Sequence, residues 1–309
     1  MGATYDRMKV ADPLWRRMRD RFNNLITLAN ATRAVLIGLN PHLTDDVTNT
    51  AATPALSAVL NAETMRDAQQ SLYVAYEAHR ASGTYHAAAD STNTMASPPT
   101  AKSVYDLLNN LKTKYNAHRV LTGSSVHGAA DSTNVVSAAD ADTKAKAVTL
   151  ANAIRTEYEA HRILTTSSVH GAADATNAVT VAAVTSASTW VEIAALADNI
   201  RTKYEAHRIL TAGSVHGAAD NTNSATVAAV GTVDTLDIAC ANDLKAKVNA
   251  HLILVSSHKI VEQTFKVVGA DATTSAGALV LTREVLGNYQ NHISRAVYAA
   301  ASAPAVETI

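Results

Sequence analysis

Apolar residues recur every three or four positions along several segments of the chain, which is the spacing of one face of an α-helix. One such stripe consists of Leu150, Ile154, Tyr158 and His161. Each stripe ends on a histidine, so these histidines are expected on the buried face of their helices. The pattern predicts an all-α chain with about seven long helices, over roughly 13–36, 54–80, 98–119, 138–163, 189–209, 233–253 and 275–299.

Capping residues agree with several of these helix starts. A capping side chain precedes a proline at Asp12-Pro13, Thr53-Pro54 and Ser97-Pro98, and Thr189 with Glu192 has the capping-box spacing. The linkers of about 15 to 25 residues are rich in Ser, Thr, Gly, Asp and Asn, and are long enough to run back along a helix of roughly 35 Å. The pattern leaves both parallel and antiparallel packing open, and we favour parallel neighbours.

Two sequence blocks alternate along the chain. The helix block is YEAHR or YNAHR, at 76–80, 115–119, 158–162 and 204–208. The loop block is YHAAADSTN from Tyr85 and VHGAADSTN, VHGAADATN and VHGAADNTN from Val126, Val169 and Val215. These blocks predict one repeat domain over 1–309, stacked as a short solenoid or a bundle. Its degenerate first unit covers 13–52, clear units cover about 53–232, degenerate last units cover about 233–300, and a short tail covers 301–309.

Composition narrows the classes of partner. Hydrophobic residues make up 47% of the chain but aromatic residues only 5%, which favours small side chains between closely packed helices. Lys and Arg number 26 against 27 Asp and Glu, so we expect no binding to nucleic acid. The chain has no apolar run of transmembrane length and no apolar signal segment, so we expect no membrane insertion. The single cysteine, Cys240, is expected to be a small buried residue.

All 12 histidines belong to the repeat. Those on helices are His79, His118, His161, His207, His251 and His292. Those in loops are His42, His86, His127, His170, His216 and His258. A carboxylate follows each loop histidine by four residues, at Asp46, Asp90, Asp131, Asp174, Asp220 and Glu262. Pairing every loop histidine with the next helix uses all twelve, from His42 with His79 to His258 with His292.

Each predicted set of two imidazoles and a carboxylate has two interpretations. Such a set is the facial ligand triad of non-haem iron, and it suits zinc with one open position. Alternatively, hydrogen bonds from the histidines pin each loop to a helix without metal. We prefer structural pinning, with no cofactor, and keep a metal-binding or metal-storage protein holding zinc or iron as the alternative.

The other recurrent residues have simple structural interpretations. Asp-x-Thr-Asn is typical of a local turn. The tyrosine three residues before the helix histidine is expected to be a core aromatic whose hydroxyl finds a polar partner. The arginine after that histidine, at Arg33, Arg80, Arg119, Arg162 and Arg208, is expected to pair with a carboxylate or a helix C-terminus. Because every reactive group is repeated and no nucleotide or zinc-protease motif occurs, we predict that the protein is not an enzyme.

The alternation of YxAHR with VHGAADxTN, joined by Ala-rich helices, resembles repeat-containing virion structural proteins of tailed bacteriophages. The resemblance covers roughly 30–300. It implies a structural or assembly subunit of the capsid surface, neck or tail, made in the bacterial cytoplasm and located in the virion. It also implies a homo-oligomer that contacts other virion proteins. Thr32 and Val248 depart from the helix block, and the block after His258 is eroded, which suggests end units adapted to capping or to contacts with other proteins.

Overall fold

The computed structural model describes residues 46, 48–51, 61–86, 88–254, 258 and 264–293. Within these ranges the fold is all-α, as the periodicity predicts, and contains no strand. The helices are α3 (Ala62–Ala81), α4 (Thr100–His118), α5 (Lys144–Arg162), α6 (Trp190–Arg208), α7 (Val233–Leu252) and α8 (Ser275–Ile293). Short 3-10 turns, η2 (Gly123–Ser125), η3 (Thr166–Ser168) and η4 (Ala212–Ser214), follow α4, α5 and α6. The helix predicted over 13–36 lies outside the described residues.

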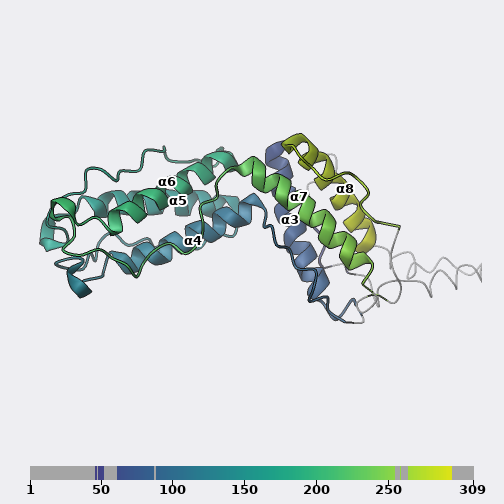
Figure 1. The fold of residues 1–309 in the computed structure, drawn as a ribbon, viewed down its shortest axis with the longest axis horizontal. Coiled ribbons are helices and arrows are strands. Elements are labelled where there is room, and N and C mark those ends of the chain that lie inside the picture. Colours follow the sequence, from purple (N-terminus) through teal and green to yellow (C-terminus); the bar gives the residue numbers. More distant parts are fainter. Residues whose placement is uncertain are drawn as a thin grey trace, which may run out of the picture.

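The helices form two bundles of three that meet at an elbow (Figure 1). In the first bundle α4, α5 and α6 each pack against the other two, and in the second α3, α7 and α8 do the same. Each bundle buries its own apolar cluster. A closed triangle of helices distinguishes this arrangement from a solenoid, in which each unit contacts only its sequence neighbours. Of the two predicted arrangements, the structure therefore has the bundle.

The three helices of the first bundle are parallel, because their C-terminal histidines lie together at one end. The linkers run back along the helices and bury Val136, Val184 and Val230 against them. Asn109 of α4 holds one linker through both polar atoms of its side-chain amide. Its Nδ2 donates to the carbonyl of Ala141 at 3.1 Å, and its Oδ1 accepts from the Ala141 amide at 2.7 Å. The predicted return of the linkers is thus observed.

Three predicted helix starts need correction. The helix predicted over 54–80 begins only at Ala62, where Asn61 and Thr64 form a capping box at the start of α3. The start at 138 is wrong, because the Ala-rich segment before Lys144 lies along α4, and Thr143 caps α5 by accepting from the Lys146 amide. The predicted capping by Ser97 is also wrong, since α4 begins after Pro99, which provides no side-chain cap. The capping box of Thr189 and Glu192 at the start of α6 is confirmed. The sites at Asp12-Pro13 and Thr53-Pro54 lie outside the described residues.

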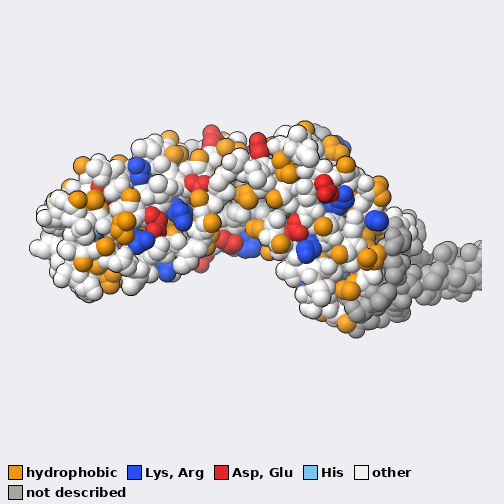
Figure 2. All heavy atoms as spheres, viewed as in Figure 1, with side chains coloured by type: hydrophobic (Ala, Val, Ile, Leu, Met, Phe, Trp, Pro, Cys, Tyr) orange, Lys and Arg blue, Asp and Glu red, His pale blue; other side chains and the backbone are white. Residues whose placement is uncertain are grey.

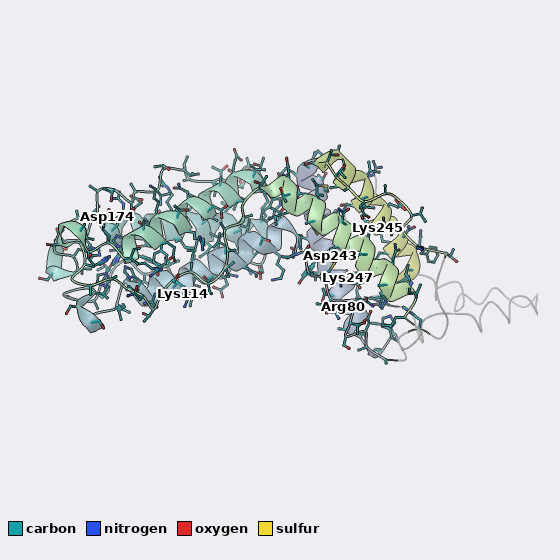
Figure 3. All side chains as sticks on the ribbon, in the orientation of Figure 1. Arg80, Lys114, Asp174, Asp243, Lys245 and Lys247 are labelled. Carbon is teal, nitrogen blue, oxygen red and sulfur yellow. The ribbon has the colours of Figure 1, made fainter. Side chains whose placement is uncertain are left out.

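The N-terminal ends of the helices meet at the elbow. Arg66 of α3 donates from Nε to the buried Asp237 of α7 at 2.9 Å, and the Thr100 hydroxyl of α4 donates to the other Asp237 oxygen at 2.9 Å. Trp190, at the start of α6, donates from Nε1 to Asp67 of α3 at 2.9 Å. These bonds join the two bundles. Asp174 and Arg80, which are labelled in Figure 3, lie towards the ends of the first and second bundle that point away from the elbow.

The surface mixes acidic, basic and apolar side chains without a large patch of one charge on the face drawn in Figure 2. Almost no histidine is visible there, in agreement with the burial of every described helix histidine. Among the described helices, none is long and apolar enough to cross a membrane. Cys240 is buried as predicted, and burial raises the pKa of its thiol.

Candidate metal centre

The last turn of each helix in the first bundle carries a buried histidine that points to the bundle axis. These are His118, His161 and His207, and none is measurably exposed. The Nδ1 atom of each lies 2.9 Å from a carboxylate oxygen of the neighbouring unit: His118 from Asp220, His161 from Asp131, and His207 from Asp174. An ionised carboxylate only accepts hydrogen bonds, so Nδ1 carries the proton and Nε2 is left with a lone pair.

The Asp-x-Thr-Asn sequence fixes each of these carboxylates. Oδ1 of Asp131 accepts from the amide and hydroxyl of Thr133, both at 2.9 Å, and from the Asn134 amide at 3.1 Å. Its Oδ2 accepts from the Asn134 side chain at 2.8 Å and from His161. Asp174 and Asp220 have the same partners in their own loops. The predicted turn is confirmed, and it also orients the carboxylate towards a helix.

The loop histidines of the first bundle have the same tautomer for a different reason. The Nδ1 atom of His127 lies 3.0 Å from the carbonyl oxygen of Leu121. His170 and His216 make the equivalent contact, at 3.1 Å, with the carbonyls of Leu164 and Leu210. A carbonyl only accepts, so Nδ1 is again the donor and Nε2 again has the lone pair. The sequence gives no direct signal of this, because the acceptor is a backbone atom.

The six imidazole rings surround one centre, and their ligand nitrogens come together in triangular sets of three. Neighbouring ring centroids lie 4.7 to 5.5 Å apart, and each ring contacts every other ring except the one opposite to it. The opposite pairs are His118 with His170, His127 with His207, and His161 with His216. This is an octahedron with the helix histidines on one triangular face and the loop histidines on the other. In each of four triangular faces, the three ligand nitrogens lie within 4.8 Å of one another.

None of these six Nε2 atoms has a hydrogen-bond partner, although all are buried. A buried polar atom without a partner costs about 1 to 3 kcal/mol, so six in one place are a large penalty for a purely structural cluster. Lone pairs that point at one another also repel. A cation at the centre of the octahedron relieves both costs.

The loops around the cluster close into a ring. The amide of Gly128 donates to Val169 O at 3.2 Å, that of Gly171 to Val215 O at 3.3 Å, and that of Gly217 to Val126 O at 3.2 Å. A Cβ added at any of the three glycines would lie 2.4 Å from a serine carbonyl of the next loop. Glycine is therefore required for this close approach. The glycine of the VHG sequence is the sequence signal of this contact.

Electrostatics suit neutral ligands around a cation. Burial lowers the pKa of His118 and His161, and lowers those of His207 and His216 to about 4. These imidazoles are therefore neutral near pH 7, as metal ligation requires. The pKa values of Asp131, Asp174 and Asp220 are lowered, against the effect of burial, by their hydrogen bonds to histidine and to the turn. The three ionised carboxylates give the surroundings of the cluster negative charge.

The second bundle has a related cluster at its own far end. Its described members are His79, His86, His251, His258 and His292, all buried. His79 lies 2.6 Å from Asp46 through Nδ1, and His251 lies 3.0 Å from Asp90. His42 and Glu262, which the sequence also predicts to belong here, lie outside the described residues.

Two predicted pairings and the predicted ligand set need correction. Asp90 bonds His251 rather than His118, and Asp220 bonds His118 rather than His251. The reason is that α4–α6 close on themselves, so the loop before α4 pairs with α7. In every described set the carboxylate bonds the Nδ1 atom of a histidine. It therefore lies behind the imidazole, not beside two imidazoles as the predicted facial triad requires. The contacts of His161 with Asp131 and of His207 with Asp174 follow the predicted order.

The recurrent tyrosine and arginine of the helix block have the contacts that the sequence predicts. The Tyr115 hydroxyl lies 2.8 Å from the carbonyl oxygens of Asn134 and Glu157, so it bridges its own loop and the next helix. Arg162 pairs with Glu159 and also bonds the carbonyl of Asp174. The buried tyrosine and the paired arginine are both confirmed. Arg33 lies outside the described residues.

No protein-family model, curated protein or solved structure matches the chain. The six convergent imidazoles are therefore the feature that indicates a function. Six neutral nitrogen donors in an octahedron, supported by three carboxylates, are chemically suited to a divalent transition-metal ion.

Proposed function

We propose that this chain is a structural protein whose first bundle is locked by a divalent transition-metal ion bound to six histidines. The observation that carries the proposal is the convergence of six buried Nε2 lone pairs without hydrogen-bond partners. An ion there would tie together three helices and three loops that are otherwise joined by side-chain packing, by the His–Asp and tyrosine hydrogen bonds, and by the glycine ring. Binding to the folded state alone adds stability, about 4 kcal/mol when free metal is 1,000 times its Kd.

The donor set favours some ions over others. Octahedral sites of oxygen donors suit magnesium and calcium, whereas imidazole suits iron, nickel, copper and zinc. Zinc sites in proteins are almost always tetrahedral when structural, so six equivalent imidazoles are poorly matched to it. Iron(II), cobalt(II) and nickel(II) accept six nitrogens. Of the two metals that the sequence suggests, iron therefore fits this geometry better than zinc.

A structural role follows from how the octahedron is filled. Catalytic metal centres keep a coordination position for water or substrate, and structural ones are closed by protein ligands. Here His118, His127, His161 and the three remaining imidazoles provide every position. We propose accordingly that the ion stabilises the fold and that the chain is no enzyme. Its assembly role, as a virion component that forms homo-oligomers, is the part of the proposal that rests on the resemblance of its repeats.

The first test is metal content and thermal unfolding of the full chain with and without a chelator. We expect bound iron, cobalt or nickel, and a lower unfolding midpoint after chelation. His161→Gln with His207→Gln should abolish the response of the first bundle to added metal. Tyr158→Phe is the matched control, since it removes a buried hydroxyl that contacts two carbonyls near His161 but leaves all six ligands.

A different result would refute the metal-locked bundle. If the chelated and metal-loaded chains unfold at the same midpoint, the histidines pin the loops without metal. Native mass spectrometry of the same samples tests the assembly role separately. An oligomer supports a building block of a larger particle, and a monomer that binds no copy of itself contradicts it.

A further inference from the structure

We propose that the far end of the second bundle is a second metal site, held by His79, His86, His251, His258 and His292. This inference rests on the proposed metal binding in the first bundle. It raises the expected number of ions per chain from one to two and predicts that the two sites hold their ions unequally. The same elements build it: three histidines come from the C-terminal turns of α3, α7 and α8, and two come from loops. The sites lie at opposite ends of the elbow-shaped molecule (Figure 1).

The five rings occupy five corners of an octahedron like that of the first bundle. Their neighbouring centroids lie 4.5 to 5.7 Å apart. His251 contacts all four others, and the remaining rings form a square around it. Ligand nitrogens of His79, His86, His251 and His292 lie within 4.8 Å of one another. These four nitrogens are close enough to share an ion, and the ring of His258 completes the square around His251.

The spacing of the nitrogens is the strongest observation. The Nε2 atom of His79 lies 3.2 Å from that of His86 and 3.3 Å from that of His292. Metal–nitrogen bonds of about 2.1 Å place adjacent nitrogens of an octahedron about 3.0 Å apart. These rings therefore already have nearly the spacing that a shared ion requires.

The tautomers of His79 and His86 require a proton or a metal ion between their Nε2 atoms. His79 donates from Nδ1 to Asp46, and His86 donates from Nδ1 to the Ser82 carbonyl at 3.0 Å. Both Nε2 atoms then present lone pairs across 3.2 Å, which is repulsive unless a proton or a metal ion lies between them. Asp46 and Asp90 bring two buried carboxylates to the outer side of His79 and His251, at 2.6 and 3.0 Å from their Nδ1 atoms. Negative charge there favours a divalent ion over a single proton.

The second site differs from the first in its support. In the first bundle the three glycine amides join three loops in a ring, whereas the loop of His86 has Ala87 in place of the glycine, and Lys259 stands at the matching place after His258. A side chain at this position cannot make the close approach that the glycines allow in the first bundle, and more loosely joined loops would exchange an ion faster. We therefore expect the second bundle to lose metal to a chelator sooner than the first.

The test is a titration of the chelated full chain with nickel(II), followed by native mass spectrometry. We expect two ions per wild-type chain, one in His161→Gln with His207→Gln, and one in His251→Gln with His79→Gln. Tyr289→Phe is the matched control for the second bundle, because its hydroxyl contacts the Asn49 carbonyl and is no ligand. This control should keep both ions.

The outcomes separate the two proposals. One ion in the wild type, retained by the His79 and His251 variant and lost by the His161 and His207 variant, refutes the second site and leaves the first intact. No ion in the wild type refutes both. If the His79 and His251 variant does not fold, the first-bundle variant decides alone, since one retained ion supports the second site and none refutes it.

Discussion

Replacing Gly171 with alanine tests whether the loop ring sets the geometry of the histidine cluster. The added Cβ would lie 2.4 Å from the carbonyl oxygen of Ser214, whereas ordinary contact begins at 3.4 Å, so the two loops must separate by about 1.0 Å. That shift stretches the 3.3 Å bond from the Gly171 amide to the Val215 carbonyl and moves His170, the adjacent histidine of the cluster. Overpacking costs about 1–3 kcal/mol, and the lost hydrogen bond costs about 1 kcal/mol.

We therefore expect Gly171→Ala to lower the free energy of unfolding of the first bundle by about 2–4 kcal/mol. Chemical denaturation of the chelated chain measures this without a contribution from metal. Gly123→Ala is the matched control, because its Cβ would find only Leu121 Cδ1, at 3.9 Å, in the same bundle. A Gly171→Ala chain within about 0.5 kcal/mol of the control, a change typical of neutral surface substitutions, would show that the loops are not held by this close approach.

Three further predictions concern the layers around the cluster. Asp174→Asn removes the charge that orients His207, so metal affinity should fall roughly 10- to 100-fold in a nickel titration. Tyr115→Phe leaves two carbonyls without their shared donor, and denaturation should show a loss of about 1–3 kcal/mol with metal still bound. The chelated chain should lose stability as pH falls from about 6.5 towards 4, because burial lowers the folded-state pKa of His207 and His216 to about 4 while the unfolded chain binds protons near 6.5. A stability that rises on acidification over this range would contradict that sign.

Much of the fold is predictable because the helix signals are periodic and strong. Stripes such as Leu150, Ile154, Tyr158 and His161 identify the buried face, and all four of these residues are buried. The error at the start of α5 has a local cause. An Ala-rich stretch has high helix propensity, but Asn109 bonds both the amide and the carbonyl of Ala141 and keeps that segment extended along α4.

The sequence identifies the histidines of the clusters, but it does not predict which carboxylate bonds which histidine. Selection needs only the repeat, because all 12 histidines recur at its fixed positions. The pairing of histidine with aspartate depends on which three helices pack into one bundle, and the sequence pattern does not specify that. Asp90 and Asp220 exchange the partners expected from chain order, since the linker after α6 returns to the elbow and starts α7 in the other bundle.

If the first bundle binds a six-coordinate ion as proposed, the coordination number gives a physical reason for grouping the units in threes. One helix-and-loop unit provides two imidazoles, so one unit or two leave an octahedral ion with open positions, and three fill it. Three units also close the loop ring, in which Gly217 returns to Val126, the first loop of the bundle. A fourth unit would have neither a coordination position nor a free place in that ring. On this argument a longer array would add whole bundles rather than single helices, and the insertion of α4–α6 between α3 and α7 is one way for a continuous chain to do so.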